Sequence, residues 1–169
     1  MKSSSSFGAA RFAVVACLLL VVLYILTAQL GLVEMLNHAN ARVLHACLQV
    51  MGLPTQLDGD VVATGSMRLQ IITECTGLYS MLILASAVLA FPAPVRAKVL
   101  GIAVGLPFVM LVNVGRLITL AFIGNAWPDL FHATHVYLWQ VTLLLMIVCA
   151  WVVWARWAGR LAARAAAGE

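Results

Sequence analysis

The sequence predicts an all-α integral membrane protein, a bundle of about four transmembrane helices with an outer surface helix and a small outer β-hairpin. Three observations lead to this prediction. Hydrophobic residues make up 64% of the 169 residues and charged residues only 9%, whereas a soluble domain has roughly one quarter charged residues. Apolar runs long enough to cross a bilayer recur along the chain. Basic residues gather beside those ends of the apolar runs that would lie on the same side of the membrane.

Four apolar runs have the length needed to cross a hydrocarbon core of about 30 Å. They are residues 12–32, 69–91, 99–123 and 136–154. The first run is longer than the apolar part of a signal peptide, so we expect a retained helix. The whole chain, residues 1–169, is expected to form one membrane domain, with residues 33–68 as its outer region.

The basic residues predict the orientation of these spans. Seven of the ten lysines and arginines flank the spans, namely Lys2, Arg11, Arg96, Lys98, Arg156, Arg160 and Arg164. If the spans alternate in direction, all of them fall on one side, and the positive-inside rule makes that side cytoplasmic. Both termini are therefore expected in the cytoplasm. The net charge of +4 reflects these flanking residues, so the expected partner is a lipid bilayer and not a nucleic acid.

The outer region contains two predicted elements. Residues 34–53 place apolar side chains at a helical spacing, which indicates a helix on the membrane surface. Residues 56–72 contain two short alternating runs separated by the sequence ATGS, which is typical of a β-hairpin.

Polar side chains from three different spans are expected at one depth, just under the outer surface. At about 1.5 Å per helical residue from the cytoplasmic edge, Cys75 lies about 24 Å, Arg116 about 26 Å and His135 about 28 Å up. Side chains at one level can meet, so we expect a shared pocket. His132, one turn before His135, could take the place of that histidine.

Arg116 is the strongest indication of a functional site. An arginine inside a membrane helix costs roughly 2.5–3.5 kcal/mol on insertion scales, so it needs partners. Asn113 lies one turn earlier on the same face and could hold the guanidinium. The alternatives are an arginine that extends to the membrane surface and a cysteine with a purely structural role at position 75.

The combination suits a cysteine nucleophile. A thiol attacks as its thiolate, and His135 could accept the proton. Arg116 could donate to the oxyanion of a tetrahedral intermediate. Gly77 would leave room for a substrate backbone. Glu74 opposes thiolate formation unless its side chain is turned away, so its role is left open.

The motifs ECTGLYS, NVGRL and HVYLWQ, each on a successive span, resemble the exosortase/archaeosortase family and are most similar to the exosortase H type. The resemblance covers residues 74–157. It implies that Cys75, which precedes Thr76 and Gly77, is the nucleophile, and that Arg116 and His135 are its catalytic partners. Most members of the family have additional spans, so this chain would be a minimal core.

The resemblance also implies a reaction. The chain would be a membrane cysteine transpeptidase or peptidase that acts without a cofactor or a metal at the outer face of the bacterial inner membrane. Its partners would be secreted proteins with a C-terminal sorting signal, for the H type a tail of the IPTLxxWG kind. A thioester formed at Cys75 would pass to an acceptor that the sequence does not identify.

Three other functions are compatible with parts of the pattern. Asp129, His132 and His135 are spaced so that they could bind a metal or haem in a membrane redox protein. Cys47 could pair with Cys75 in a thiol oxidoreductase, although no C-x-x-C motif is present. A non-catalytic membrane scaffold would need none of these side chains.

Overall fold

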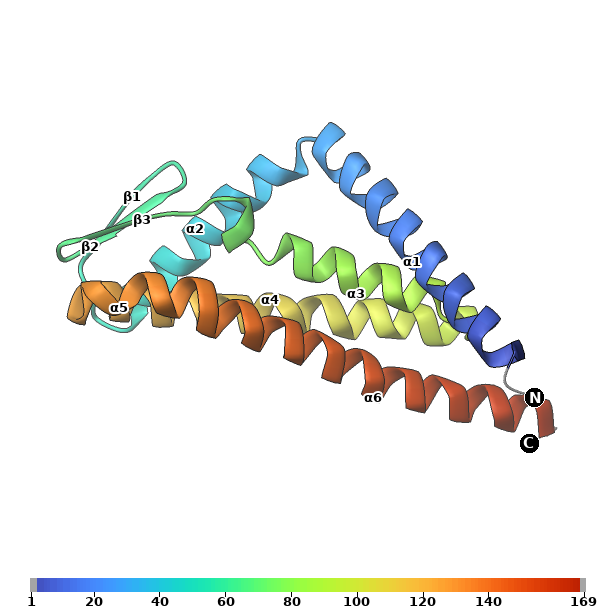
Figure 1. Cartoon of the computed structure of the whole chain (residues 1–169). Coiled ribbons are helices and arrows are strands. Elements are labelled where there is room, and N and C mark those ends of the chain that lie inside the picture. Colours follow the sequence, from blue (N-terminus) through green and yellow to red (C-terminus); the bar gives the residue numbers. More distant parts are fainter. Residues whose placement is uncertain (1–2, 168–169) are drawn as a thin grey trace.

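The computed structural model describes residues 3–167, and long helices make up most of it (Figure 1). The helices are α1 (Ser3–Gln29), α2 (Leu32–Val50), α3 (Leu78–Ala90), α4 (Val95–Ala126), α5 (Pro128–Ala133) and α6 (Trp139–Ala167). The strands β1 (Thr55–Asp58), β2 (Val61–Thr64) and β3 (Met67–Gln70) form an antiparallel sheet in the order β1-β2-β3. A 3-10 turn, Thr73–Cys75, precedes α3, and a π-helical segment, Thr134–Leu138, joins α5 to α6.

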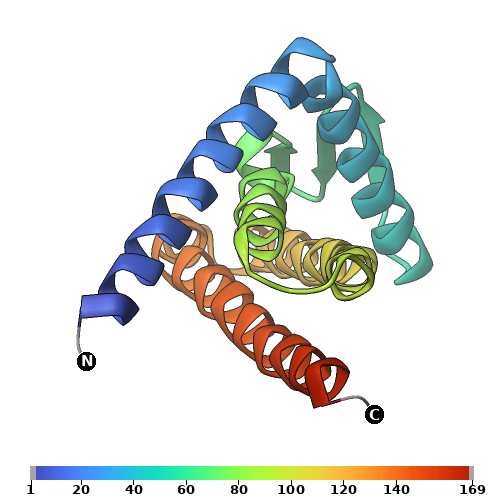
Figure 2. The ribbon, with the colours of Figure 1, turned by 90° about the vertical axis from the view of Figure 1, so that its right-hand side faces the viewer.

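The helices α3, α4 and α6 run side by side, and α1 leans across α3 (Figure 1). Viewed from the end of the bundle, α1 and α2 meet at an angle over α3 (Figure 2). The sheet and α2 occupy one end of the molecule. The start of α1, the start of α4 and the end of α6 lie at the other end (Figure 1). The helix ends that carry most of the basic residues therefore lie together, away from the sheet.

Three helical segments are long and apolar enough to cross a membrane. They are Gly8–Gln29, Val95–Ala126 and Pro128–Leu161, the last of which runs through α5, the π-helical segment and α6. Their outward faces are apolar; Leu18 is 61% exposed and Leu111 is 73% exposed. Large exposed aliphatic surfaces of this kind suit contact with lipid.

The predicted span over residues 69–91 is not a single helix. Its first two residues belong to β3, and α3 begins only at Leu78. The buried Leu69 and Ile71 alternate with exposed neighbours, which is the period of a strand. Gly77 then takes a positive φ of 75°, which interrupts regular helix before α3. The expected four full spans become three long helices and α3, whose 13 residues extend about 20 Å.

The outer region also differs from its prediction, because it holds a three-stranded sheet instead of a two-stranded hairpin. Both turns contain a glycine with a positive φ, Gly59 at 60° and Gly65 at 58°, as tight hairpin turns require. Beside the sheet, α2 turns one apolar face inward, formed by Asn40, Ala41, Leu44 and Leu48. The fold is therefore mostly helical, with a small sheet packed against α2.

A buried cluster at the sheet end joins α2, the sheet and α4. It consists of Ala41, Leu44, Leu48, Val62, Leu69, Ile71, Cys75, Leu117 and Ala121. A second cluster, Leu84, Val88, Val109 and Ile147, joins α3, α4 and α6 further along the bundle. The first cluster places Cys75 where the sheet and the helices meet.

The contact between α4 and α6 gives a first prediction. Gly101 is buried, and an added Cβ would overlap the indole nitrogen of Trp154, which donates to the carbonyl oxygen of Ala97 at 3.0 Å. Gly101→Ala should therefore lower stability by about 1–3 kcal/mol, as overpacking usually does. Thermal unfolding in detergent, followed by tryptophan fluorescence, would measure this change.

Gly115→Ala on the same helix is the matched control for Gly101→Ala. An added Cβ at Gly115 meets no atom within 4 Å, so this variant should unfold at or above the wild-type temperature. Equal unfolding temperatures for the two variants would contradict the predicted overlap with Trp154.

Candidate active site

Cys75 ends the single 3-10 turn between β3 and α3. Its N–H donates to the carbonyl oxygen of Ile72 at 2.8 Å. The hydroxyl of Thr76 donates to the carbonyl oxygen of Thr73 at 2.7 Å and accepts from the N–H of Leu78 at 3.2 Å. Thr76 therefore fixes both the turn that carries the thiol and the first turn of α3.

Gly77 allows this turn to lie directly against α4. An added Cβ would lie 3.2 Å from both Cβ and Cγ of Asn113, and the positive φ is also unfavourable for other residues. The glycine thus allows the turn to approach the side chain of Asn113 closely. The role that the sequence suggested, room for a substrate backbone, stays a prediction.

Asn113 is completely buried and holds the backbone of Cys75. Its Nδ2 donates to the carbonyl oxygen of Cys75 at 2.8 Å and to Oδ1 of Asn40 at 3.2 Å. Asn40 in turn donates to the carbonyl oxygen of Leu36 at 2.9 Å. The amide of Asn113 was expected to hold Arg116; its observed partners are Cys75 and Asn40.

Asn40 was not found by the sequence reasoning. It is 1% exposed and lies on the inward face of α2 beside Ala41 and Leu44. The sequence did contain a signal for Asn40, because it occupies a position of the apolar face where the helical spacing predicts a hydrophobic residue. A buried amide needs a hydrogen-bond partner, so such a position indicates a polar contact.

Arg116 is 5% exposed and lies one turn after Asn113 on α4. Its Nη1 donates to the carbonyl oxygen of Glu74 at 3.1 Å. Among residues 3–167, no acceptor lies within hydrogen-bond distance of its Nε. The guanidinium is therefore anchored at one nitrogen, while its buried Nε has no acceptor among the described residues.

Glu74 contacts Arg116 through its backbone, and its residue is exposed. Its carboxylate forms no ion pair with Arg116 within the described residues. The side chain lines the mouth of the site together with Ile72. The structure thus places Glu74 beside the thiol without giving it a direct contact to the cysteine.

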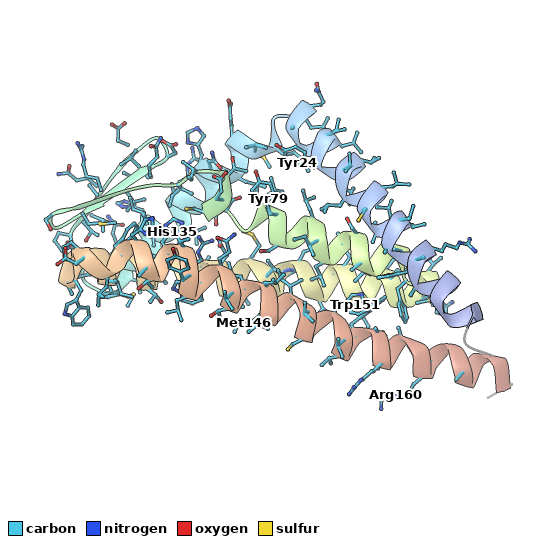
Figure 3. The ribbon with its side chains drawn as sticks, in the orientation of Figure 1. Tyr24, Tyr79, His135, Met146, Trp151 and Arg160 are labelled. Carbon is cyan, nitrogen blue, oxygen red and sulfur yellow. The ribbon has the colours of Figure 1, made fainter. Side chains whose placement is uncertain are left out.

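His135 lies within the π-helical segment, and its Nε2 is 4.0 Å from Sγ of Cys75. The imidazole packs edge-on against Phe131, with ring centroids 5.7 Å apart. Figure 3 shows His135 near the sheet end of the helix that continues as α6. Single π-helical turns frequently occur at functional sites, where they redirect a side chain. His132 is exposed on α5 and does not reach the thiol.

A groove of about 420 Å³ adjoins these side chains. It is lined by Ile72, Glu74, Gly77, Tyr79, Ser80, Ile83, Arg116, His135, Val136, Gln140, Leu143, Leu144 and Ile147. Its polar end holds Arg116 and His135, and its apolar end runs between α3 and α6. A larger, almost wholly apolar groove of about 640 Å³ surrounds Gly101 and Trp154, away from Cys75.

The electrostatic environment keeps the thiol protonated at rest. Burial raises the pKa of the Cys75 thiol above its ordinary value, and the negative charge of Glu74 raises it further. The positive charge of Arg116 and a backbone hydrogen bond at Ile72 act in the opposite direction, but burial is the largest effect. A base is therefore needed to form the thiolate near neutral pH.

The metal ligands considered from the sequence do not come together. Over the part of the chain that the structure describes, no three histidine, cysteine, aspartate or glutamate side chains are grouped closely enough to bind a metal ion. Asp129 and His132 are exposed, while His135 faces Cys75. Cys47 and Cys75 are both free thiols.

The charges around Cys75 lead to a second prediction. Arg116→Met should raise the pKa of the thiol and slow its alkylation near neutral pH, because a positive charge is lost. Glu74→Gln should lower that pKa and speed alkylation, with the smaller effect of the two. Alkylation rates measured against pH, in a chain whose other cysteines are replaced by serine, would test both directions.

Glu34→Gln, which removes an exposed carboxylate on α2, is the matched control for Glu74→Gln. Its alkylation profile should match the wild-type profile. A faster reaction in Arg116→Met than in the wild type would contradict the proposed influence of the guanidinium.

Comparison with known proteins agrees with the resemblance seen in the motifs. The family model described as Transmembrane exosortase (Exosortase_EpsH) matches residues 3–141. No curated protein and no solved structure shows a significant match to the chain. The matched region includes all three motifs and most of the membrane helices, so this multi-pass membrane protein belongs to the transmembrane exosortase family.

Proposed function

We propose that the protein is a membrane cysteine transpeptidase or peptidase that cleaves C-terminal sorting signals of secreted proteins. The observation that carries this proposal is the 4.0 Å approach of Cys75 Sγ to His135 Nε2, beside the buried guanidinium of Arg116. The three side chains come from separate segments of the chain. Arg116 and His135 line one end of a groove, and the buried thiol of Cys75 lies behind this lining, beside His135. Membership of the exosortase family supports the same reaction.

The first step is attack on the scissile carbonyl. His135 Nε2 accepts the proton of the Cys75 thiol, and the sulfur forms a bond to the carbonyl carbon. The carbonyl oxygen becomes an oxyanion, to which the guanidinium of Arg116, which lines the groove, donates a hydrogen bond. A thiol–imidazole distance of 4.0 Å in the free enzyme shortens when substrate closes the site.

The second step releases the sorting signal. His135 returns its proton to the leaving amine as the C–N bond breaks, which leaves a thioester on Cys75. An acceptor amine or a water molecule then attacks the thioester and regenerates the thiol. A thiol that is protonated until substrate arrives is protected from unwanted reactions in the resting enzyme.

The remaining motif residues position the nucleophile. Asn113 holds the carbonyl of Cys75, and Thr76 holds the turn. Gly77 permits the close packing against α4. The charge of Glu74 favours the protonated thiol in the resting state, which gives this residue a tuning role.

The apolar end of the groove suits the helical part of a sorting signal. It lies between α3 and α6, where Ile83, Leu144 and Ile147 face it. A substrate with a short motif, a transmembrane helix and a basic cluster would place its helix there and its motif at Cys75. This arrangement corresponds to the bacterial inner membrane, with the sheet outside and both termini in the cytoplasm.

A tailed reporter tests the proposal. The protein is co-expressed with a secreted reporter that ends in an IPTLxxWG-type tail, and loss of the tail is followed by its size on gels. Cys75→Ala and Cys75→Ser should both abolish processing, because a hydroxyl does not replace a thiolate. His135→Gln should slow processing roughly 10²–10⁴-fold and Arg116→Gln roughly 10²–10³-fold.

His132→Gln is the matched control, since it removes an exposed imidazole one turn before His135. Processing in this variant should stay at the wild-type level. Undiminished processing by Cys75→Ala would rule out the proposed nucleophile and favour a non-catalytic scaffold.

A further inference from the structure

The strand β3 has one edge without a hydrogen-bonded neighbour. The N–H of Ile71 donates to the carbonyl oxygen of Asp60 at 2.8 Å. This bond shows which opposite residues of β2 and β3 form hydrogen-bonded pairs, because such pairs alternate with pairs that are not hydrogen-bonded. Leu69 and Met67, opposite Val62 and Thr64, therefore direct their N–H and C=O groups toward β2. The main-chain groups of the alternate residues, Arg68 and Gln70, point away from the sheet.

This edge is accessible. The sheet order places β1 beside α2 and β3 at the opposite edge. β3 contacts α4, where the side chain of Met67 lies against Gly124. Figure 2 shows the sheet behind α3 with α2 on one side of it. Arg68 and Gln70 are both exposed. Within residues 3–167, no backbone partner is found for either residue outside the sheet. Free strand edges of this kind readily pair with another extended chain.

The edge also leads directly to the candidate active site. β3 ends at Gln70, and the chain continues through Ile72 and Glu74, which line the groove, to Cys75. Figure 1 shows β3 running from the far tip of the sheet toward the start of α3. A peptide lying along β3 would therefore bring its next residues to the thiol.

We propose that β3 binds the extended segment of the substrate that precedes the scissile bond, as an added strand. This inference rests on the proposed function and specifies how its substrate is held. The N–H and C=O groups of Arg68 and Gln70 provide the main-chain hydrogen bonds, and every second substrate side chain faces the enzyme. Main-chain pairing gives affinity that is independent of sequence, so side-chain contacts nearer Cys75 determine specificity.

The direction of the added strand follows from the position of the C-terminal tail of the substrate. Beyond Cys75 the substrate must continue along α3 and α6, toward the end of the bundle that lies away from the sheet. The segment before the scissile bond therefore runs in the same direction as β3. The added strand is parallel to β3, although β1, β2 and β3 are antiparallel to one another.

Disulfide trapping tests both the contact and its direction. All four native cysteines are replaced by alanine, which also keeps the substrate uncleaved, and a cysteine is introduced by Arg68→Cys or Gln70→Cys. The same tailed reporter carries single cysteines at successive positions before the scissile bond. After mild oxidation, crosslinks should form at alternate reporter positions, and the preferred position for Gln70→Cys should lie two residues nearer the scissile bond than that for Arg68→Cys.

Gln56→Cys is the matched control. Gln56 pairs with Ala63, which pairs with Arg68, so its side chain lies on the same exposed face but at the other edge of the sheet. This variant should give severalfold less crosslinking to the reporter. Restoring Cys75 in the Gln56→Cys variant should restore processing, and every variant should elute like the wild type in size-exclusion chromatography in detergent, which shows that the variants fold.

Three outcomes would overturn the inference. A shift in the opposite direction would mean antiparallel pairing, and equal crosslinking at Gln56→Cys would mean non-specific contact. Crosslinks between two copies of the enzyme in place of enzyme and reporter would assign the edge to self-association. If the wild type processes the reporter but β3 gives no crosslinks, only the inference fails; if it never processes the reporter, the proposed function fails.

Discussion

The hydrogen bond from Asn113 to the carbonyl of Cys75 is the interaction on which the geometry of the site depends. It is 2.8 Å long and joins α4 to the turn between β3 and α3. Both partners are buried, where an unpaired amide or carbonyl would cost several kcal/mol on water-to-hydrocarbon scales. The same Nδ2 also reaches Asn40, so this one amide joins α4, α2 and the turn that carries Cys75.

Arg116 makes a second contact of this kind, to the residue that precedes Cys75. Asn113 and Arg116 lie one helical turn apart on α4, and they bind the consecutive carbonyls of Cys75 and Glu74. The backbone at Glu74 and Cys75 is therefore held at two adjacent points by one face of α4. The guanidinium of Arg116 is positioned by the same contact.

The side chains of the site come from both regular and irregular helical segments. Arg116 and Asn113 lie in a long regular helix, whereas Cys75 lies in a 3-10 turn and His135 in a π-helical segment. The side chains of the two irregular segments lie 4.0 Å apart, measured from Cys75 Sγ to His135 Nε2. The turn that carries the thiol follows β3 directly, and the groove between α3 and α6 begins beside it.

Composition and periodicity determined the membrane class, the long helical segments and the gathering of basic residues at one end, because lipid imposes a strong and local requirement for apolar length. The motifs around Cys75, Arg116 and His135, with the shared depth of these residues, identified the family and the members of the candidate site. The outline of the fold and the proximity of Cys75, Arg116 and His135 could thus be predicted from the chain alone.

Only the tertiary structure decided the rest. It divided residues 69–91 into a strand, a turn and the short α3, because the positive φ of Gly77 and the pairing with β2 outweigh apolar length. It placed His135, which lies within the π-helical segment, and not His132 beside the thiol. It also brought Asn40 to Asn113, a contact between residues far apart in the chain that no local pattern contains. Such contacts depend on how distant segments pack, which is a property of the folded chain as a whole.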